Sequence, residues 1–392
     1  MNRILNNQDP VLQRLQDQVR TAQNQGTALQ LRGGGTKAFY GGLPRGELLD
    51  LRPLSGISSY EPSELVITAL AGTPLAEVEA ALAQKGQCLA FEPPRFLACV
   101  DGAGAGSSTA IAAQAASETA ASGGTVGGMV CSGLAGPSRA SVGGVRDYVL
   151  GVTLLNGSAE LLSFGGQVIK NVAGYDVSRL LTGSMGVLGV VCEVSLKVLP
   201  VAAASQTLCF EWDQAQALLS LNQWAGQAIP LNASVWHQGR LSLRLRGAAA
   251  AVAASARLLG GHTLEAGLAD RFWDSLRDQR HAFFGLTKGE LETGERLWRL
   301  SLPSTAAPLV LEGEQLIEWG GAQRWWRTRV PATQVRELAR GAGGHATLFR
   351  AADKTIGVFE PLDAPLMRIH RELKKAFDPA GVFNPGRLYA DL

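Results

Sequence analysis

The sequence predicts an α+β protein with two domains, and three observations lead to this prediction. The chain has 392 residues, more than one ordinary hydrophobic core accommodates. Up to residue 200, glycine pairs separate short apolar runs. Beyond a break at 200–204 the doublets thin out, and helical patterns alternate with strands. We therefore expect a first domain over 1–200, a second over 201–365, and a C-terminal segment, 366–392, that returns to the first domain.

The first 85 residues combine helix and strand patterns. Leu12, Leu15 and Val19 share one face of a first predicted helix. Asp9 is a suitable cap for its start, and Gly26 would end it. A second helix follows Thr73 and completes a small αβ unit that covers one face of a sheet. The predicted elements are helices over 9–25 and 74–85, strands over 28–32, 47–51 and 65–70, and a polar turn over 60–63.

A glycine run, RGGGTKAFYGG, covers residues 32–42 directly after the first predicted strand. Consecutive glycines after a strand expose a row of backbone N–H groups that can form an anion-binding concavity. Lys37 adds a positive charge, so a diphosphate would fit here. Taken alone, the run is explained equally well by a glycine-rich turn.

Residues 96–122 contain an apolar run, GAGAG and an alanine-rich stretch, which together are similar to a dinucleotide-binding turn. The true fingerprint needs GxGxxG spacing and an acidic residue about 20 positions further on. Here Gly102, Gly104 and Gly106 are evenly spaced, and only Glu118 follows. We interpret 96–122 as a low-complexity surface insertion, with a nicotinamide site as the alternative.

The glycine-rich stretch 123–151, GGTVGGMVCSGLAGPSRASVGGVRDYVLG, is where we place the ligand. Glycine lets the backbone lie directly against a flat or charged molecule. A flexible linker would also be rich in glycine, but interleaved apolar residues favour packed turns around a bound molecule. Strands at 148–155 and 160–164 then form a hairpin closed by Asn156-Gly157.

The next segment, 171–200, predicts a short helix, a tight GSMG turn and a buried strand over 187–199. In the second domain, Leu241, Leu243 and Leu245 alternate with polar residues, which predicts a half-buried strand with a basic outward face formed by Arg244 and Arg246. The other predicted elements are helices over 213–225, 248–259, 270–281, 332–340 and 366–377, strands over 296–302 and 345–349, and a proline-pinned turn over 378–387.

Composition excludes several classes of function. The net charge is +2 and no basic stripe carries interleaved aromatics, so nucleic-acid binding is not expected. The five cysteines form no CxxC or Cys/His cluster, which argues against a metal or iron–sulfur site and for reduced thiols in the cytoplasm. No run of about 18 apolar residues is present to span a bilayer. Membrane contact is therefore expected only through partners.

Four motifs in this order resemble the FAD-binding proteins of the vanillyl-alcohol oxidase / p-cresol methylhydroxylase (PCMH) type. They are RGGGTKAFYGG, GGTVGGMVCSGLAG with VGGVRDYVLGV, GYDVSRLLTGSMGVLGVVCEVSLKVLP, and the terminal FDPAGVFNPGR. LIEWGGAQRWWR (316–327) and GAGGHATLFR (341–350) are similar to the smaller FAD-binding subunits of bacterial glycolate oxidase (glycolate dehydrogenase) complexes. The resemblance implies a PCMH-type FAD-binding domain with a ferredoxin-like α+β cap domain.

The resemblance also implies which residues hold FAD. It implies that Gly33, Gly34, Gly35, Thr36 and Lys37 form the diphosphate loop, with Arg32 as a further cofactor-binding residue. It places Thr125, Gly127, Gly128, Ser132 and Gly133 along the ring system and ribityl chain, Gly186 and Val187 on the adenine side, and Asn384 at the flavin from the C-terminal end. Relatives that bind flavin covalently often carry histidine just after the glycine loop. Thr36 stands there in this sequence, so we expect dissociable, non-covalent FAD.

Oxidation of a 2-hydroxy acid on flavin needs a base for the hydroxyl proton and a cation for the carboxylate. His345 is the best candidate base, with a hydrogen-bonded structural histidine as the alternative. Arg324 is the candidate cation, with a stacked surface residue as the alternative. Catalytic relatives carry GDGN-x-H in the second domain, whereas this chain has GGHAT at 343–347. Both direct oxidation of glycolate to glyoxylate and a supporting or electron-relay role stay open.

Electrons must leave the reduced flavin, and this chain has no cysteine cluster to accept them. The resemblance implies two partners: a larger FAD-linked glycolate oxidase subunit and an iron–sulfur subunit. Three tryptophans, Trp319, Trp325 and Trp326, lie among arginines in a composition suited to a protein interface. Ordinary core and rim residues are an equal alternative. The chain is expected in the cytoplasm, with any membrane association through the complex.

Overall fold

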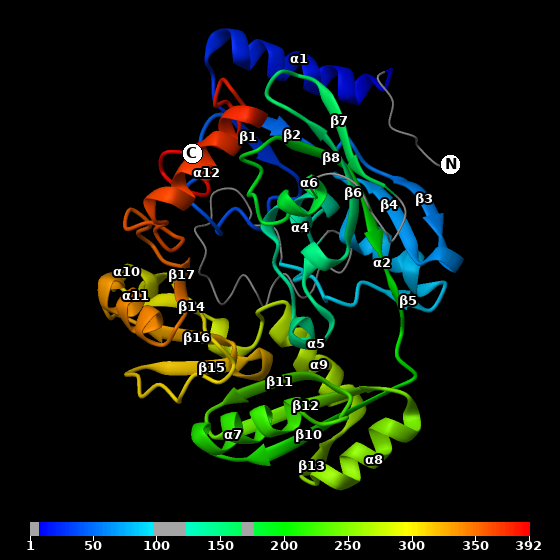
Figure 1. Cartoon of the computed structure of the whole chain (residues 1–392), viewed down its shortest axis with the longest axis vertical. Coiled ribbons are helices and arrows are strands. Elements are labelled where there is room, and N and C mark those ends of the chain that lie inside the picture. Colours follow the sequence, from blue (N-terminus) through cyan, green and yellow to red (C-terminus); the bar gives the residue numbers. More distant parts are fainter. Residues whose placement is uncertain (1–7, 97–122, 167–175) are drawn as a thin grey trace.

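The computed structural model describes residues 8–96, 123–166 and 176–392. Two sheets organise these residues, one above the other in the view of Figure 1. The five-stranded sheet consists, in spatial order, of β3 (Ile57–Glu61), β4 (Val66–Leu70), β8 (Val190–Lys197), β6 (Val149–Leu155) and β7 (Leu161–Gly165). Its neighbouring strands are antiparallel. The central strand β8 is almost entirely buried, as its apolar run predicts.

A hydrophobic cluster joins this sheet to the short helices beside it. α2 (Leu75–Ala83) contributes Val78, and α4 (Val126–Ser132) contributes Val130 to the same core as Val194 of β8. The smaller elements here are η1 (Pro62–Glu64), β5 (Gln87–Cys88), α5 (Arg139–Val142), η2 (Val145–Asp147), α6 (Val177–Leu180) and β9 (Leu199–Pro200).

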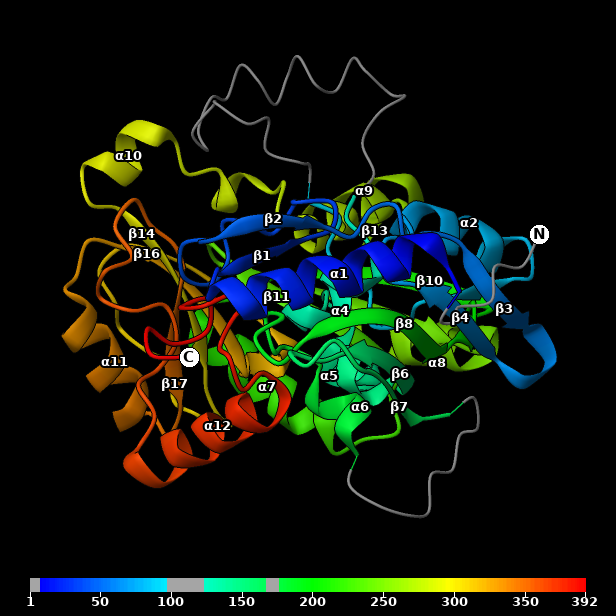
Figure 2. The same cartoon turned by 90° about the horizontal axis from the view of Figure 1, so that it is seen from above.

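A separate parallel pair, β1 (Leu29–Arg32) and β2 (Glu47–Asp50), lies under helix α1 (Pro10–Gln25), as both views show (Figures 1 and 2). Asp9 caps α1 by accepting the N–H groups of Val11 and Leu12, which confirms the predicted start. The end of the chain joins this pair after α12 (Ala364–Phe377), because Phe383 bridges Leu29 in parallel register. The first and last parts of the chain therefore share one core.

The eight-stranded sheet begins with a β-α-β-β-α-β unit whose strands lie in the order β13-β10-β12-β11. This is the ferredoxin-like arrangement that the family resemblance implies for this part of the chain. Four more strands, in the order β15-β16-β14-β17, extend the sheet. The strands are β10 (Ala204–Glu211), β11 (Leu231–His237), β12 (Arg240–Gly247), β13 (His262–Leu264), β14 (Arg296–Ser301), β15 (Glu314–Glu318), β16 (Gln323–Thr328) and β17 (His345–Arg350).

Helices cover this sheet on both faces. Helices α7 (Gln214–Ala225) and α8 (Ala249–Leu259) share a core with Leu243 of β12. Helix α5 contacts β11 between the two sheets (Figure 1). The other helices here are α9 (Ala266–Arg277), η3 (Ala282–Phe284), α10 (Lys288–Glu292), η4 (Trp319–Gly321) and α11 (Ala332–Gly341). No helix in the described ranges is both long and apolar enough to cross a membrane.

The prediction of an exposed basic face on β12 is wrong. Arg244 is 3% exposed, and its guanidinium donates to Glu92 at 2.7 Å and to Asn232 at 2.6 Å. Glu92 lies 152 positions earlier in the chain, beyond the reach of a local pattern. An ion pair of this kind satisfies a charge that would otherwise be costly to bury.

Two local predictions also differ from the structure. The expected polar turn at 60–63 is partly strand, because β3 pairs with β4 as an edge strand up to Glu61. The β6–β7 hairpin is confirmed, but residues 156–160 connect it rather than a two-residue turn. Asn156 accepts the N–H groups of Ser158 and Glu160, which closes this longer loop. The proposed insertion, apart from Phe96, lies outside the described residues.

Candidate functional site

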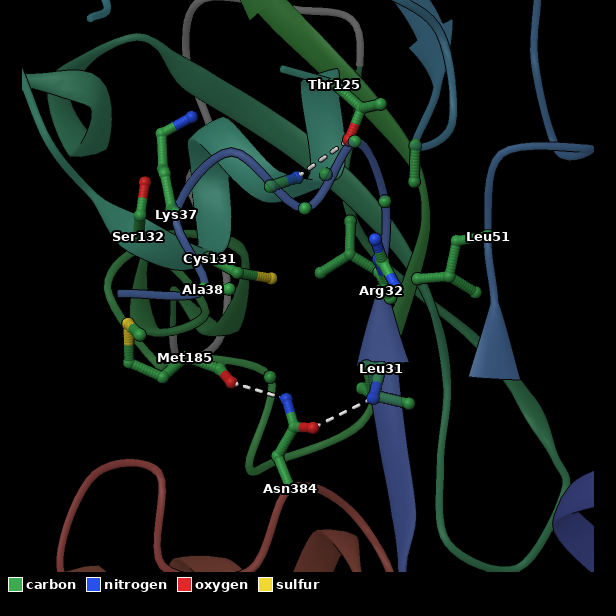
Figure 3. A pocket seen from close by; sticks show the side chains of 18 of the residues that line it. Leu31, Arg32, Lys37, Ala38, Leu51, Thr125, Cys131, Ser132, Met185 and Asn384 are labelled. Carbon is green, nitrogen blue, oxygen red and sulfur yellow. Dashed lines mark hydrogen bonds between the residues drawn. The ribbon is translucent and has the colours of Figure 1, made fainter. Parts of the chain in front are cut away.

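A cavity of about 410 Å³ lies where four separate parts of the described chain meet (Figure 3). Its walls come from the glycine loop after β1, from α4, from the turn before β8, and from the C-terminal motif. Its lining residues include Leu31, Arg32, Gly33, Gly34, Gly35, Thr36, Lys37, Ala38, Leu51, Ala71, Thr125, Gly127, Gly128, Cys131, Ser132, Met185, Gly186, Asn384 and Arg387. All four quoted sequence motifs therefore contribute to one site.

The glycine loop presents a row of free backbone donors to this cavity. Among the described residues, none accepts a hydrogen bond from the amides of 33–37. A side chain at Gly33 would overlap the hydroxyl of Thr125. The backbone of the loop therefore packs directly against the Thr125 side chain at the start of α4. Unpaired amides that line a cavity are suited to an anionic ligand.

Thr125 fixes the start of α4 at the opposite wall. Its hydroxyl accepts the N–H of Gly128 at 3.4 Å, and the N–H of Gly127 donates to the Ala71 carbonyl at 2.8 Å. A Cβ at Gly127 would lie 2.7 Å from the Ala71 Cβ, closer than side chains approach. Glycine is therefore needed here for α4 to lie against the end of β4.

Asn384 closes the third side of the cavity. Its Oδ1 accepts the N–H of Leu31 at 2.8 Å, and its Nδ2 donates to the Met185 carbonyl at 2.7 Å, as the dashed lines in Figure 3 show. Asn384 is buried and has φ 44°, a left-handed conformation that asparagine adopts more readily than most residues. One side chain thus ties the end of β1 to the turn before β8.

The charges on the cavity walls are positive. Burial alone lowers the pKa of Lys37 to about 8 and that of Arg387 to about 10, since no carboxylate of the described chain offsets the loss of water. Burial raises the pKa of the Cys131 thiol to about 11, so this thiol stays protonated. None of the described lining residues is Asp, Glu or His. The site therefore favours a ligand with negative charge.

These features fit FAD. The unpaired amides and Lys37 suit a diphosphate, and the glycine surface of α4 suits a flat ring system. Twelve of the predicted cofactor residues line the cavity: Arg32, Gly33, Gly34, Gly35, Thr36, Lys37, Thr125, Gly127, Gly128, Ser132, Gly186 and Asn384.

Two predicted cofactor residues do not line the cavity. Gly133 ends α4 in a left-handed conformation, with its N–H donating to Met129. The Val187 side chain is in the core, and its carbonyl accepts from Lys374 at 2.8 Å. Both residues therefore lie behind the cavity wall and support the lining residues Ser132 and Gly186 that precede them.

The structure does not bring the two predicted catalytic residues to the cavity. Arg324 is 1% exposed, and its guanidinium donates to the carbonyls of Gly321, Ala306 and Ala307. These bonds occupy the donors that would have held a carboxylate. His345 lies at the exposed start of β17, opposite Ser301 on the neighbouring strand.

The tryptophan cluster is mostly core. Trp325 and Trp326 are 4% and 3% exposed, so the alternative of ordinary packing holds for both. The Arg139 guanidinium carbon lies 4.6 Å from the centre of the Trp319 ring. Sequence reasoning missed Arg387 and Met185 as lining residues, although both belong to the quoted motifs. Leu51 and Ala71, which directly follow β2 and β4, carry no local signal.

Comparisons with known proteins agree with this geometry. A family model described as FAD binding domain matches residues 12–121. The chain is 45% identical to the glycolate oxidase subunit GlcE of Escherichia coli (strain K12) over 380 residues, 97% of this chain and 98% of that protein. It is 37% identical to the glycolate oxidase subunit GlcD of Bacillus subtilis (strain 168) over 84 residues, 21% of this chain and 18% of that protein.

Two solved structures of alkyldihydroxyacetonephosphate synthase share the fold. Their TM-scores are 0.59 and 0.61 at 12% and 14% sequence identity, over 95% of this chain and 74% of those chains. The predicted PCMH-type fold and the FAD cofactor are confirmed by these matches. Because the match to GlcE extends over almost the whole of both proteins, this chain belongs to the glycolate oxidase subunit GlcE family.

Proposed function

We propose that this chain is the FAD-binding subunit of a glycolate oxidase complex that oxidises glycolate to glyoxylate. The observation that carries the proposal is the convergence of four distant segments on one cavity that has unpaired amides, three cationic side chains and, among its described lining residues, no acidic side chain. A relative over almost the full length is named a glycolate oxidase subunit, which supports the substrate class.

In this proposal the amides of 33–36 and the Lys37 ammonium bind the diphosphate. Residues Thr125, Gly127, Gly128 and Ser132 line the flavin, and Asn384 holds the cavity closed from the C-terminal side. The FAD is non-covalent, since no described lining residue is a histidine and the described lining thiol of Cys131 is held protonated. Bound FAD supplies the two-electron acceptor that oxidation of an alcohol to a carbonyl requires.

We further propose a FAD-binding domain over 1–200, a cap over 201–365 and a returning segment over 366–392. The two larger sheets support this division, because all five strands of one come before residue 200 and all eight strands of the other come after it. The bridge between Leu29 and Phe383 supports the return of the last segment.

Electrons must leave this chain through partners. The four described cysteines, Cys88, Cys131, Cys192 and Cys209, are all free. In this proposal a larger FAD-linked subunit and an iron–sulfur subunit receive the electrons, and the complex works in the cytoplasm with membrane contact only through those partners. A GlcD subunit among the relatives is consistent with such a partner.

A second candidate function is an assembly or electron-relay subunit whose FAD does not oxidise glycolate itself. One observation favours it: the described lining residues include no histidine or carboxylate to take the hydroxyl proton, and Arg324 and His345 lie elsewhere. In that case the larger partner performs the oxidation.

An anaerobic titration separates the two candidates. Glycolate is added to the isolated, FAD-loaded chain while the visible flavin absorbance is recorded, with acetate as the control that lacks the hydroxyl. Bleaching by glycolate alone supports direct oxidation. Bleaching only after the larger subunit is added supports the relay role. A chain that carries no flavin and accepts none contradicts both.

A further inference from the structure

The segment that follows the glycine loop is held by two cations from the far end of the chain. Arg387 and Lys354 donate to five consecutive carbonyl groups in strict alternation. The acceptors are the carbonyls of Ala38, Tyr40 and Gly42 for Arg387, and those of Phe39 and Gly41 for Lys354. The two side chains together satisfy every carbonyl over 38–42.

The chemistry of the two side chains matches this division. A guanidinium carries five donors in a planar fork, and Arg387 uses it on three carbonyls, at 3.2 Å to Ala38 and 2.6 Å to Tyr40. An ammonium carries three donors, and Lys354 uses it on two carbonyls, at 3.2 Å to Gly41. Neither residue is within ion-pair distance of a carboxylate in the described ranges.

Both cations are costly to keep where they are. Arg387 is 7% exposed, and burial lowers its pKa to about 10. Burial, with the neighbouring charges of Arg387 and Arg350, lowers the pKa of Lys354 to about 8. Protein carbonyls are therefore the principal compensation that the described chain offers to these two charges, which makes the segment and the cations depend on each other.

The backbones of the two segments also touch. The N–H of Gly42 donates back to the Arg387 carbonyl at 2.9 Å, and a side chain at Gly42 would overlap the Gly386 carbonyl. Arg387 itself lines the cavity, and Ala38 follows directly on the unpaired amides of 33–37. The conformation of 38–42 is thus transmitted to the loop that faces the ligand.

We propose that Lys354 and Arg387 are positioning residues that hold the glycine loop in the conformation able to bind FAD. Neither needs to touch the reacting atoms, and the effect is exerted through the carbonyls of 38–42. The proposal rests on the FAD assignment of the cavity. It predicts that FAD affinity depends on residues more than 300 positions from the loop.

The test measures the Kd of FAD for the apoprotein by flavin fluorescence. Lys354→Met and Arg387→Met should each raise the Kd by about tenfold or more, and excess FAD should restore the visible spectrum of the parent. Lys375→Met is the control, since it removes an exposed cation on α12, and its Kd should stay within about twofold of the parent. Lys354→Arg keeps the charge and donors and should recover part of the loss.

Where Arg387→Met does not fold, Arg387→Lys keeps the charge and folds more easily, but it loses at least one of the three carbonyls. Hydrogen exchange at 38–42 in the folded variants should be faster than in the parent, while exchange in β8 stays the same. Unchanged Kd and unchanged exchange in both variants would overturn the positioning role. A parent chain that binds no FAD would instead contradict the proposed function.

Discussion

Asn384 and Leu31 lie 353 positions apart in the chain and are joined by a 2.8 Å hydrogen bond at the wall of the cavity. The same side chain donates to Met185, so a single amide connects three of the four segments that build the site. This bridge explains how a terminal motif takes part in a site that the first 200 residues otherwise form.

Replacing Asn384 by alanine should weaken FAD binding by about tenfold and lower stability by roughly 1–3 kcal/mol, because both buried partners lose their bond. Asn384→Gly is the matched variant, since glycine tolerates φ 44° as well as asparagine does. Both variants should lose affinity in a flavin fluorescence titration. If the glycine variant bound FAD like the parent, backbone conformation rather than the bridge would be the important property.

Gly33→Ala should abolish or strongly reduce FAD binding while leaving the secondary structure intact. The new methyl group would overlap the Thr125 hydroxyl, so the loop must move away from α4. We expect a Kd raised by about tenfold or more. Gly289→Ala in α10 is the control, because no atom lies within 4 Å of its added Cβ. Equal affinities for the two variants would show that the loop does not depend on this contact.

FAD affinity should fall as the pH rises above 8. Burial lowers the pKa of Lys37 to about 8 in the free protein, and a bound diphosphate would raise it again. Binding then takes up a proton above pH 8, and affinity declines by up to about tenfold per pH unit. Lys354 titrates in the same range, so the measurement compares the parent with Lys37→Met. A variant with the same pH slope as the parent would exclude Lys37 as the diphosphate cation.

Glu318 should make the fold less stable at alkaline pH. This carboxyl is 5% exposed and accepts from Trp325 at 2.6 Å, and burial raises its pKa from 4.5 to about 7. The folded state therefore holds a proton that the unfolded state releases above pH 4.5. The stabilisation is complete below pH 4.5 and is lost as the pH rises to 7, on the order of 3 kcal/mol.

Glu318→Gln should remove this dependence, because the amide oxygen still accepts from Trp325 and carries no charge. Denaturant unfolding at pH 8 should find the variant more stable than the parent, with little difference at pH 5. A variant less stable than the parent at pH 8 would mean that the fold stabilises the carboxylate, and the pKa of Glu318 would then not be raised.

Local patterns predicted the parts of this protein that local chemistry determines. The Asp9 cap and the spacing of Leu12, Leu15 and Val19 are sufficient for α1, and the glycine density marked two of the four walls of the cavity, the loop after β1 and α4. The ferredoxin-like unit was expected because the chain resembles a known family, and no local pattern predicted it. The edge strand β3 was missed because its sequence, ISSYE, does not alternate between apolar and polar residues.

Distant partners account for the failures. Arg244 is buried because Glu92 meets it, and Arg324 is occupied by carbonyls of 306–307 and Gly321. Glu92 lies 152 positions from Arg244, and the carbonyls of Ala306 and Ala307 lie 18 and 17 positions from Arg324, so a basic residue in a strand pattern gave no sign of its burial. The hydrogen bonds from Lys354 and Arg387 to the carbonyls of 38–42 likewise join residues more than 300 positions apart, so no local pattern predicts them.

The flavin content of the purified chain tests the central claim most directly. The chain is saturated with FAD, freed of excess, and precipitated with acid, and flavin is then measured in the supernatant and the pellet. The cavity described here predicts one FAD per chain, all of it released to the supernatant. A chain that retains no FAD, or one whose flavin stays in the pellet, would contradict a single dissociable FAD held by these four segments.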